Sequence, residues 1–240
     1  MIRRLIVPWP DDRPFRDRAG RPIRLLAASD EREPGLEVEA NRTGILPIDA
    51  VIGCGDLDPH WLAFLADAFS APLIYIRGNH DVGGDWDEHD PVVPVPLGSG
   101  TMQRLAGIAV VAFEWPGAGS GRNRRRPDLA WRDVIGLLRR RVARRLRDPR
   151  ASAEPVLVIS HAAPEGAGDA PDLYHRGFAA YRTVLRRLRP PLWLHGHTTT
   201  ASVDSLVVHS GGTMLVNVTG AVVVELVPPG GGVAGPADPA

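Results

Sequence analysis

Short apolar runs recur along the chain, and most of them end at glycine or at a polar residue. Runs of four to eight residues with this composition are typical of strands that are covered on both faces. The pattern predicts strands over residues 23–28, 50–53, 73–76, 108–113, 155–159 and 192–194. Three more runs follow at close spacing, at 206–209, 213–216 and 222–227.

Between several of these runs, apolar residues recur every three to four positions, which predicts amphipathic helices over 59–69, 128–147 and 178–188. In the longest helix, the predicted buried stripe consists of Trp131, Val134, Ile135, Leu138, Val142 and Leu146.

Strands and helices alternate in the first half of the chain, which favours a parallel-rich sheet. The close spacing of the last three runs favours a second, antiparallel-rich sheet. The predicted fold class is therefore α/β, a four-layer α/β/β/α sandwich of two mixed sheets with helices outside.

The length of 240 residues suits one domain with a sizeable core. We predict a single domain over 1–227, with 1–22 as an N-terminal extension. The segment 228–240 is rich in glycine, proline and alanine, cannot bury a core and is predicted to be disordered. Twenty-eight basic residues, all arginine, balance 28 acidic ones, so the net charge favours neither nucleic acid nor an anionic membrane.

The sequence contains one cysteine, Cys54, which excludes an internal disulfide and fits a reducing compartment. A small buried residue is the favoured interpretation over a reactive thiol. The N-terminal apolar run, residues 5–7, is too short for a signal peptide or a membrane span, and Pro8 interrupts it. We expect a soluble, cytoplasmic protein with no membrane association.

Metal-ligand residue types follow five of the predicted strands. Each alone is weak evidence, because an aspartate after a strand is usually a turn residue or a helix cap. In an α/β sheet, however, the carboxyl ends of the strands gather around one ligand site. The ordered set predicts a metal site and comprises Asp30, Asp56, Asn79 with His80, His161 and His197.

Carboxylate, imidazole and amide ligands together suit a divalent Mn, Fe or Zn ion. Such an ion offsets the negative charge of a phosphate ester and lowers the pKa of a bound water. Glycines beside the candidate ligands allow sharp turns and the close approach of a phosphate group.

These motifs resemble the calcineurin-like metallophosphoesterases. That family's pattern is Asp-x-His, Gly-Asp, Gly-Asn-His-Asp or Glu, a lone His, and Gly-His-x-His, in that order. The resemblance extends over residues 23–227, and the matching motifs are Gly55-Asp56, Gly78-Asn79-His80-Asp81, His161 and Gly196-His197.

The resemblance implies that Asp56 bridges two metal ions and that Asp30 belongs to the first of them. The second ion would take three further ligands, namely Asn79, His161 and His197. It also implies that His80 protonates the leaving oxygen or stabilises the transition state, with Asp81 orienting it.

Two positions depart from the family pattern. Arg32 stands where the first motif has histidine, and Thr199 stands where the last motif has its second histidine. Both missing histidines would serve the first metal, which keeps Asp30 and the shared Asp56. We therefore expect one tightly bound metal rather than two. Arg32 either binds Asp30 or a substrate phosphate, or points to solvent.

The segment from His161 to Gly177 resembles a subset of the family and is interpreted as a substrate-facing loop. His175 in this loop either contacts the substrate or packs locally. The arginines within 122–147 form either a phosphate-binding patch or a solvated face, and the zero net charge favours the solvated face.

The predicted function is hydrolysis of a phosphomonoester or phosphodiester by metal-activated water, with a small phosphorylated substrate. The alternative is a weakly active or inactive module that binds a phosphorylated ligand or a protein partner, which the two missing histidines favour. A nuclease is possible but is not favoured by the neutral charge.

Overall fold

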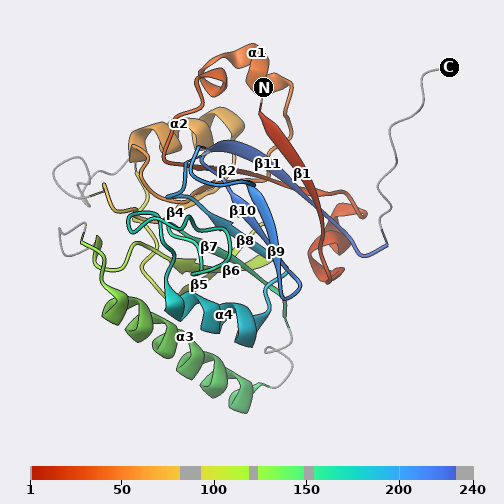
Figure 1. Cartoon of the computed structure of the whole chain (residues 1–240). Coiled ribbons are helices and arrows are strands. Elements are labelled where there is room, and N and C mark those ends of the chain that lie inside the picture. Colours follow the sequence, from red (N-terminus) through yellow and green to blue (C-terminus); the bar gives the residue numbers. More distant parts are fainter. Residues whose placement is uncertain (1, 82–92, 119–123, 149–153, 200, 231–240) are drawn as a thin grey trace.

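The computed structural model describes residues 2–81, 93–118, 124–148, 154–199 and 201–230. Two mixed sheets pack face to face, with helix α2 on one side and helices α3 and α4 on the other (Figure 1). The predicted α/β/β/α sandwich is therefore confirmed. The predicted tail from residue 231 onward lies outside the described residues.

The first sheet has the strand order β1-β11-β2-β3-β4. Its strands are β1 (Arg3–Pro8), β2 (Ile23–Ser29), β3 (Ala50–Gly53), β4 (Leu73–Tyr75) and β11 (Gly220–Val227). The second sheet has the order β5-β6-β7-β8-β10-β9. Its strands are β5 (Thr101–Leu105), β6 (Ile108–Phe113), β7 (Val156–Ser160), β8 (Leu192–His195), β9 (Val207–Ser210) and β10 (Thr213–Asn217).

Helices join or cover these strands. They are η1 (Arg13–Arg18), η2 (Pro34–Glu37), α1 (Glu39–Thr43), α2 (Pro59–Phe69), α3 (Pro127–Arg147) and α4 (Ala179–Leu188). Each predicted strand and helix is present within two residues of its predicted limits. The sequence patterns missed β1 and β5, and β1 lies in the segment that was predicted to be an extension.

The prediction of an antiparallel-rich second sheet is wrong. Strand β10 pairs antiparallel with β9 but parallel with β8, and β11 returns to the first sheet between β1 and β2. Close spacing along the chain favours a hairpin between neighbouring strands only. It does not specify which sheet the next strand joins.

Strand β2 shows why the apolar runs are continuous. Ile23, Leu25 and Ala27 face the core between the two sheets, whereas Leu26 and Ala28 face the cluster under α2. Side chains alternate between the faces of a strand, so a sheet covered on both sides takes apolar residues at successive positions. Arg24, near the start of β2, is the exception, and it pairs with Glu225 of β11 at 2.7 Å.

Helix α2 buries the face that its periodicity predicts, with Trp61, Leu62, Leu65 and Phe69 in the core. The predicted stripe of α3 is wrong in part. Val134 is buried, together with Ala130 and Leu137, but Trp131, Ile135, Val142 and Leu146 are exposed. Apolar residues occupy two adjoining faces of α3, and periodicity alone does not tell which face meets the sheet.

None of the helices among the described residues is both long enough and apolar enough to span a membrane. The strands that carry the candidate ligands end close together. The backbone amide of Asp30 donates to Gly55 at 3.1 Å, and that of Gly196 donates to His161 at 2.9 Å. The first bond joins the ends of β2 and β3, and the second joins the ends of β7 and β8.

Candidate metal centre

The turns that follow three of the strands have an unusual backbone conformation. Asp30, Asp56 and His197 have φ angles of 61°, 55° and 66°, in the left-handed region. For residues other than glycine, sparsely populated conformations of this kind cost about 1–3 kcal/mol and cluster at functional sites. All three are residues that the sequence predicts as metal ligands.

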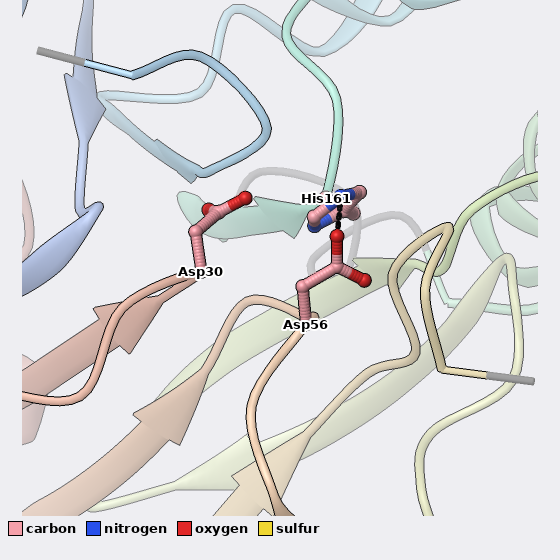
Figure 2. Close-up of side chains that lie close together, drawn as sticks. All are labelled: Asp30, Asp56 and His161. Carbon is pink, nitrogen blue, oxygen red and sulfur yellow. Dashed lines mark ion pairs between the residues drawn. The ribbon is translucent and has the colours of Figure 1, made fainter.

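Three of the predicted ligands come together at the junction of the two sheets (Figure 2). One potential ligand atom from each of Asp30, Asp56 and His161 lies within 4.8 Å of the other two. His161 is fully buried, and its Nε2 is 3.2 Å from Asp56 Oδ2. The same nitrogen is 2.8 Å from Oδ1 of the buried Asn79. A carboxylate, an amide oxygen and an imidazole thus meet at one point.

The hydrogen bonds of His161 leave its Nε2 as the nitrogen available to a cation. Its Nδ1 lies 2.8 Å from the carbonyl oxygen of Cys54, which accepts a hydrogen bond and cannot donate one. Metal-binding histidines are commonly oriented by such a bond from the other ring nitrogen. Burial lowers the pKa of His161, but the neighbouring Asp56 carboxylate outweighs burial and raises it to about 9. A bound cation would take the place of the proton that Nε2 carries.

Two glycines make room for this arrangement. A Cβ atom on Gly78 would lie 2.1 Å from Asp56 Oδ1, and one on Gly55 would lie 2.5 Å from His161 Nδ1. Both distances are too short for non-bonded atoms. The glycines in the Gly-Asp and Gly-Asn-His-Asp motifs are therefore required by the packing of the candidate ligands themselves.

His197 adjoins this cluster, with its ring centroid 5.0 Å from that of His161. Its backbone amide donates to Asp30 Oδ2 at 2.9 Å. Its Nε2 lies 2.9 Å from the carbonyl oxygen of Tyr174 and carries the proton, which leaves a lone pair on Nδ1. Burial lowers the pKa of His197 to about 3, so the ring is neutral. Within the described part of the chain, the group of ligand atoms closer than 4.8 Å does not include His197.

Asp81 braces the turns around the site. Its Oδ2 accepts hydrogen bonds from the backbone amides of Asp56, at 2.7 Å, and Gly78, at 2.6 Å. Burial raises its pKa to about 6 despite these bonds. The hydrogen bonds of Asp81 thus run to the backbone, whereas the family resemblance implies that Asp81 orients His80.

The imidazole of His80 instead bonds to Tyr174, whose hydroxyl is 2.8 Å from His80 Nε2. The backbone amide of His80 donates to Asp56 Oδ1 at 2.8 Å. Tyr174 belongs to no motif of the family pattern and was not among the predicted site residues. It lies in the loop that was predicted to face the substrate, next to the predicted site residue His175.

The family model of the calcineurin-like phosphoesterases matches residues 40–200, which is more than half of the chain. The chain belongs to the calcineurin-like phosphoesterase family. The family is metal-dependent, and the cluster of Asp30, Asp56 and His161 is a candidate ligand set in this member. The matched segment starts after Asp30, so the first motif lies outside it.

A solved structure shows the same fold as this member of the family. TT1561 of Thermus thermophilus aligns with a TM-score of 0.52 and 17% identity over 83% of this chain and 90% of that one. A protein from Streptococcus pneumoniae TIGR4, titled a predicted phosphoesterase, aligns with a TM-score of 0.36 and 15% identity. That alignment covers 83% of this chain and 73% of the other. No curated protein matches the sequence significantly.

The structure describes both residues that depart from the family pattern. Arg32 is half-exposed and pairs with Asp58, the N-cap of α2, at 2.5 Å. The observed partner of Arg32 is thus Asp58, whereas the predicted bond to Asp30 is not made; a contact between Arg32 and a substrate phosphate stays a prediction. Thr199 is exposed, and its carbonyl accepts from the amide of Ser202 at 3.0 Å. Of the expected first-metal ligands, Asp30 and Asp56 remain.

His175 lies beside the site and is held locally. Its Nδ1 is 2.9 Å from Asp172 Oδ2, and its ring centroid is 5.5 Å from that of His197. Cys54 is fully buried, and burial raises the pKa of its thiol well above the usual range. These contacts agree with the interpretation of Cys54 as a small core residue.

Proposed function

We propose that this protein is a metal-dependent hydrolase of small phosphomonoesters or phosphodiesters. The observation that carries the proposal is the convergence of Asp56, Asn79 and His161 on one point at the ends of three strands. One carboxylate, one amide and one imidazole suit Mn, Fe or Zn. The Cys54 carbonyl orients the imidazole by accepting a hydrogen bond from its Nδ1.

The residues around this point fit the requirements of ester hydrolysis. A cation held there would offset the charge of the phosphate group and lower the pKa of a bound water. Asp56 Oδ1 accepts a hydrogen bond from the backbone amide of His80, which links the turn that carries the proposed acid to a proposed metal ligand. His80 is exposed, which leaves its imidazole accessible to the leaving oxygen of an incoming ester.

Replacing His80 by alanine should separate catalysis from metal binding. We expect His80→Ala to lower kcat by about 10²–10⁴-fold, the usual contribution of general acid–base catalysis. Mn²⁺ affinity should stay close to that of the wild type, because none of the proposed ligands is altered. Turnover of p-nitrophenyl phosphate and bis(p-nitrophenyl) phosphate with Mn²⁺ measures the effect. The exposed His209, on strand β9, provides the control variant His209→Ala. Unchanged turnover in His80→Ala would remove His80 from the mechanism.

The protein should hold one metal ion tightly. Among the residues that the structure describes, the expected ligands left to the first site are Asp30 and the shared Asp56, because Arg32 pairs elsewhere and Thr199 is exposed. We expect elemental analysis after gel filtration to give about one ion per chain, as catalytic sites of this kind need three or more protein ligands. The double variant Arg32→His/Thr199→His should gain a second ion. Two tightly held ions in the wild type would contradict the proposal.

The first metal site lacks the two histidines of the family pattern, which also favours one alternative function. In this alternative, the protein is a module that binds a phosphorylated ligand without hydrolysing it. Complete inactivity towards both nitrophenyl esters with Mn²⁺, Fe²⁺ and Zn²⁺, together with metal-dependent binding of inorganic phosphate, would support this module. Turnover that disappears on substitution of Asp56 would support the hydrolase.

We also propose that the protein acts in the cytoplasm on a small substrate. The buried, unpaired Cys54 supports a reducing compartment. The balance of 28 basic and 28 acidic residues gives no overall attraction to nucleic acid.

A further inference from the structure

Tyr174 makes three hydrogen bonds to predicted site residues. Its hydroxyl lies 2.8 Å from His80 Nε2 and 3.0 Å from Asn79 Nδ2. Its backbone carbonyl lies 2.9 Å from His197 Nε2. Asn79 and His80 follow strand β4 of the first sheet, whereas His197 follows β8 of the second. Tyr174 therefore joins the two halves of the site.

The chemistry of these groups determines which atom donates each bond. The Asn79 amide nitrogen can only donate, so the phenol oxygen accepts from it. The single phenol proton is then free to be donated to His80 Nε2. Donation from Nδ2 also fixes the amide so that Asn79 Oδ1 faces His161, at 2.8 Å. One hydroxyl thus sets the orientation of a proposed metal ligand and of the proposed acid.

No other side chain of the described residues has a hydrogen bond to the His80 ring. The family pattern expects Asp81 to orient this histidine, but the Asp81 carboxylate accepts from the amides of Asp56 and Gly78. His80 is exposed, and an exposed ring without a partner samples several rotamers. The Tyr174 hydroxyl restrains the ring to the orientation seen here.

The loop around Tyr174 is itself held in place, although the Tyr174 side chain is 53% exposed. Asp172 Oδ1 accepts from the amides of Tyr174 and His175, each at 2.9 Å. Asp169 accepts from the amide of Gly177 at 2.9 Å. The Tyr174 ring also packs on His197, with centroids 5.3 Å apart.

The Arg125 guanidinium also holds the loop, because it donates hydrogen bonds to the carbonyl oxygens of Arg176 and Gly177. The Arg125 cation also lies over the ring of Phe178, at 4.4 Å from its centroid. These contacts hold the loop, and with it Tyr174, in one place.

We propose that Tyr174 is a positioning residue of this site, which orients His80 for proton transfer and fixes the Asn79 amide towards the metal. This inference rests on the proposed function and adds to it a residue outside the family pattern. Because Tyr174 acts through His80 and Asn79, the tests must distinguish its effect on these two side chains from a general loss of stability.

The first test compares Tyr174→Phe with wild type and with Leu173→Ala, which alters the exposed neighbour in the same loop. Phenylalanine keeps the ring but removes the hydroxyl. We expect kcat on bis(p-nitrophenyl) phosphate with Mn²⁺ to fall about 10- to 100-fold, as for other residues that orient metal ligands. KM should change much less, and Leu173→Ala should behave like the wild type.

A double-mutant cycle with His80→Ala tests the proposed route. If Tyr174 acts largely through His80, Tyr174→Phe should lower kcat far less in the His80→Ala background than in the wild type. Equal losses in both backgrounds, or a wild-type kcat for Tyr174→Phe, would overturn the inference.

A third measurement does not depend on activity. In the metal-free protein, Tyr174→Phe should shift the imidazole nitrogen resonances of His80, identified by their loss in His80→Ala, whereas Leu173→Ala should not. Mn²⁺ affinity should also fall in Tyr174→Phe, because the Asn79 amide is released. Unchanged His80 resonances would refute the positioning role. If the His80 resonances shift in Tyr174→Phe but the wild type hydrolyses no ester, only the proposed hydrolase activity is refuted.

Discussion

Replacing Asp56 by asparagine should abolish tight metal binding and turnover together. Asparagine keeps the shape of the side chain and removes only its charge. The Asp56 carboxylate is nearly buried, faces His161 at 3.2 Å and also accepts from the His80 amide. Without it, the cation loses its central anionic ligand, and His161 loses the partner that raises its pKa.

We expect Mn²⁺ affinity of Asp56→Asn to fall at least about 100-fold, since even residues that only orient metal ligands contribute 10- to 100-fold. Isothermal titration calorimetry measures the affinity, and circular dichroism checks that the variant is folded. Asp67→Asn, on the exposed side of α2, is the matched control with the same change in charge. An Asp56→Asn protein that binds Mn²⁺ like the wild type would contradict the proposed centre.

Placing alanine at Gly196 should destabilise the whole fold as well as the site. The Cβ atom would lie 1.9 Å from Ser29 Oγ and 2.4 Å from Asp30 Oδ2. The Ser29 hydroxyl is buried and is held by the carbonyls of Cys54 and Gly55, at 3.1 and 3.0 Å, so it has little freedom to move away. The clash lies where the two sheets meet, because Gly196 follows β8 and Ser29 ends β2.

Overpacking of a well-packed interior typically costs about 1–3 kcal/mol, and we expect Gly196→Ala to lower the free energy of unfolding by this amount. Urea unfolding should show a lower midpoint with an unchanged slope. Gly98→Ala is the control, because a Cβ atom there meets nothing within 4 Å. Equal midpoints for the two variants would show that the sheets can separate at this point without cost.

The metal-ligand motifs could be located from the sequence because each follows a strand that is apolar on both faces. The ends of such strands are visible from the polar residues that follow an apolar run within two or three positions, as Asp30 and Asp56 do. The glycines beside them were also visible. Their specific role appeared only in the structure, where a Cβ atom on Gly78 would collide with Asp56.

The roles of Arg32 and Tyr174 could not be predicted, for a physical reason that they share. Both depend on contacts between distant parts of the chain. The Tyr174 hydroxyl meets His80 across 94 residues, and Arg32 meets Asp58 across 26. Local patterns carry information about which face of an element is buried, but not about which loop covers the end of another strand.

The amino-acid sequence by itself therefore determined the layered α/β architecture, most strands and helices, and the residue types that end the central strands. It did so because burial on both faces of a sheet leaves a continuous apolar run, and because ligands must follow such runs. Only the tertiary structure decided that β11 crosses to the first sheet, which face of α3 is buried, and that Tyr174 rather than Asp81 contacts His80. These outcomes depend on the packing of whole layers against one another, which no local pattern of residues records.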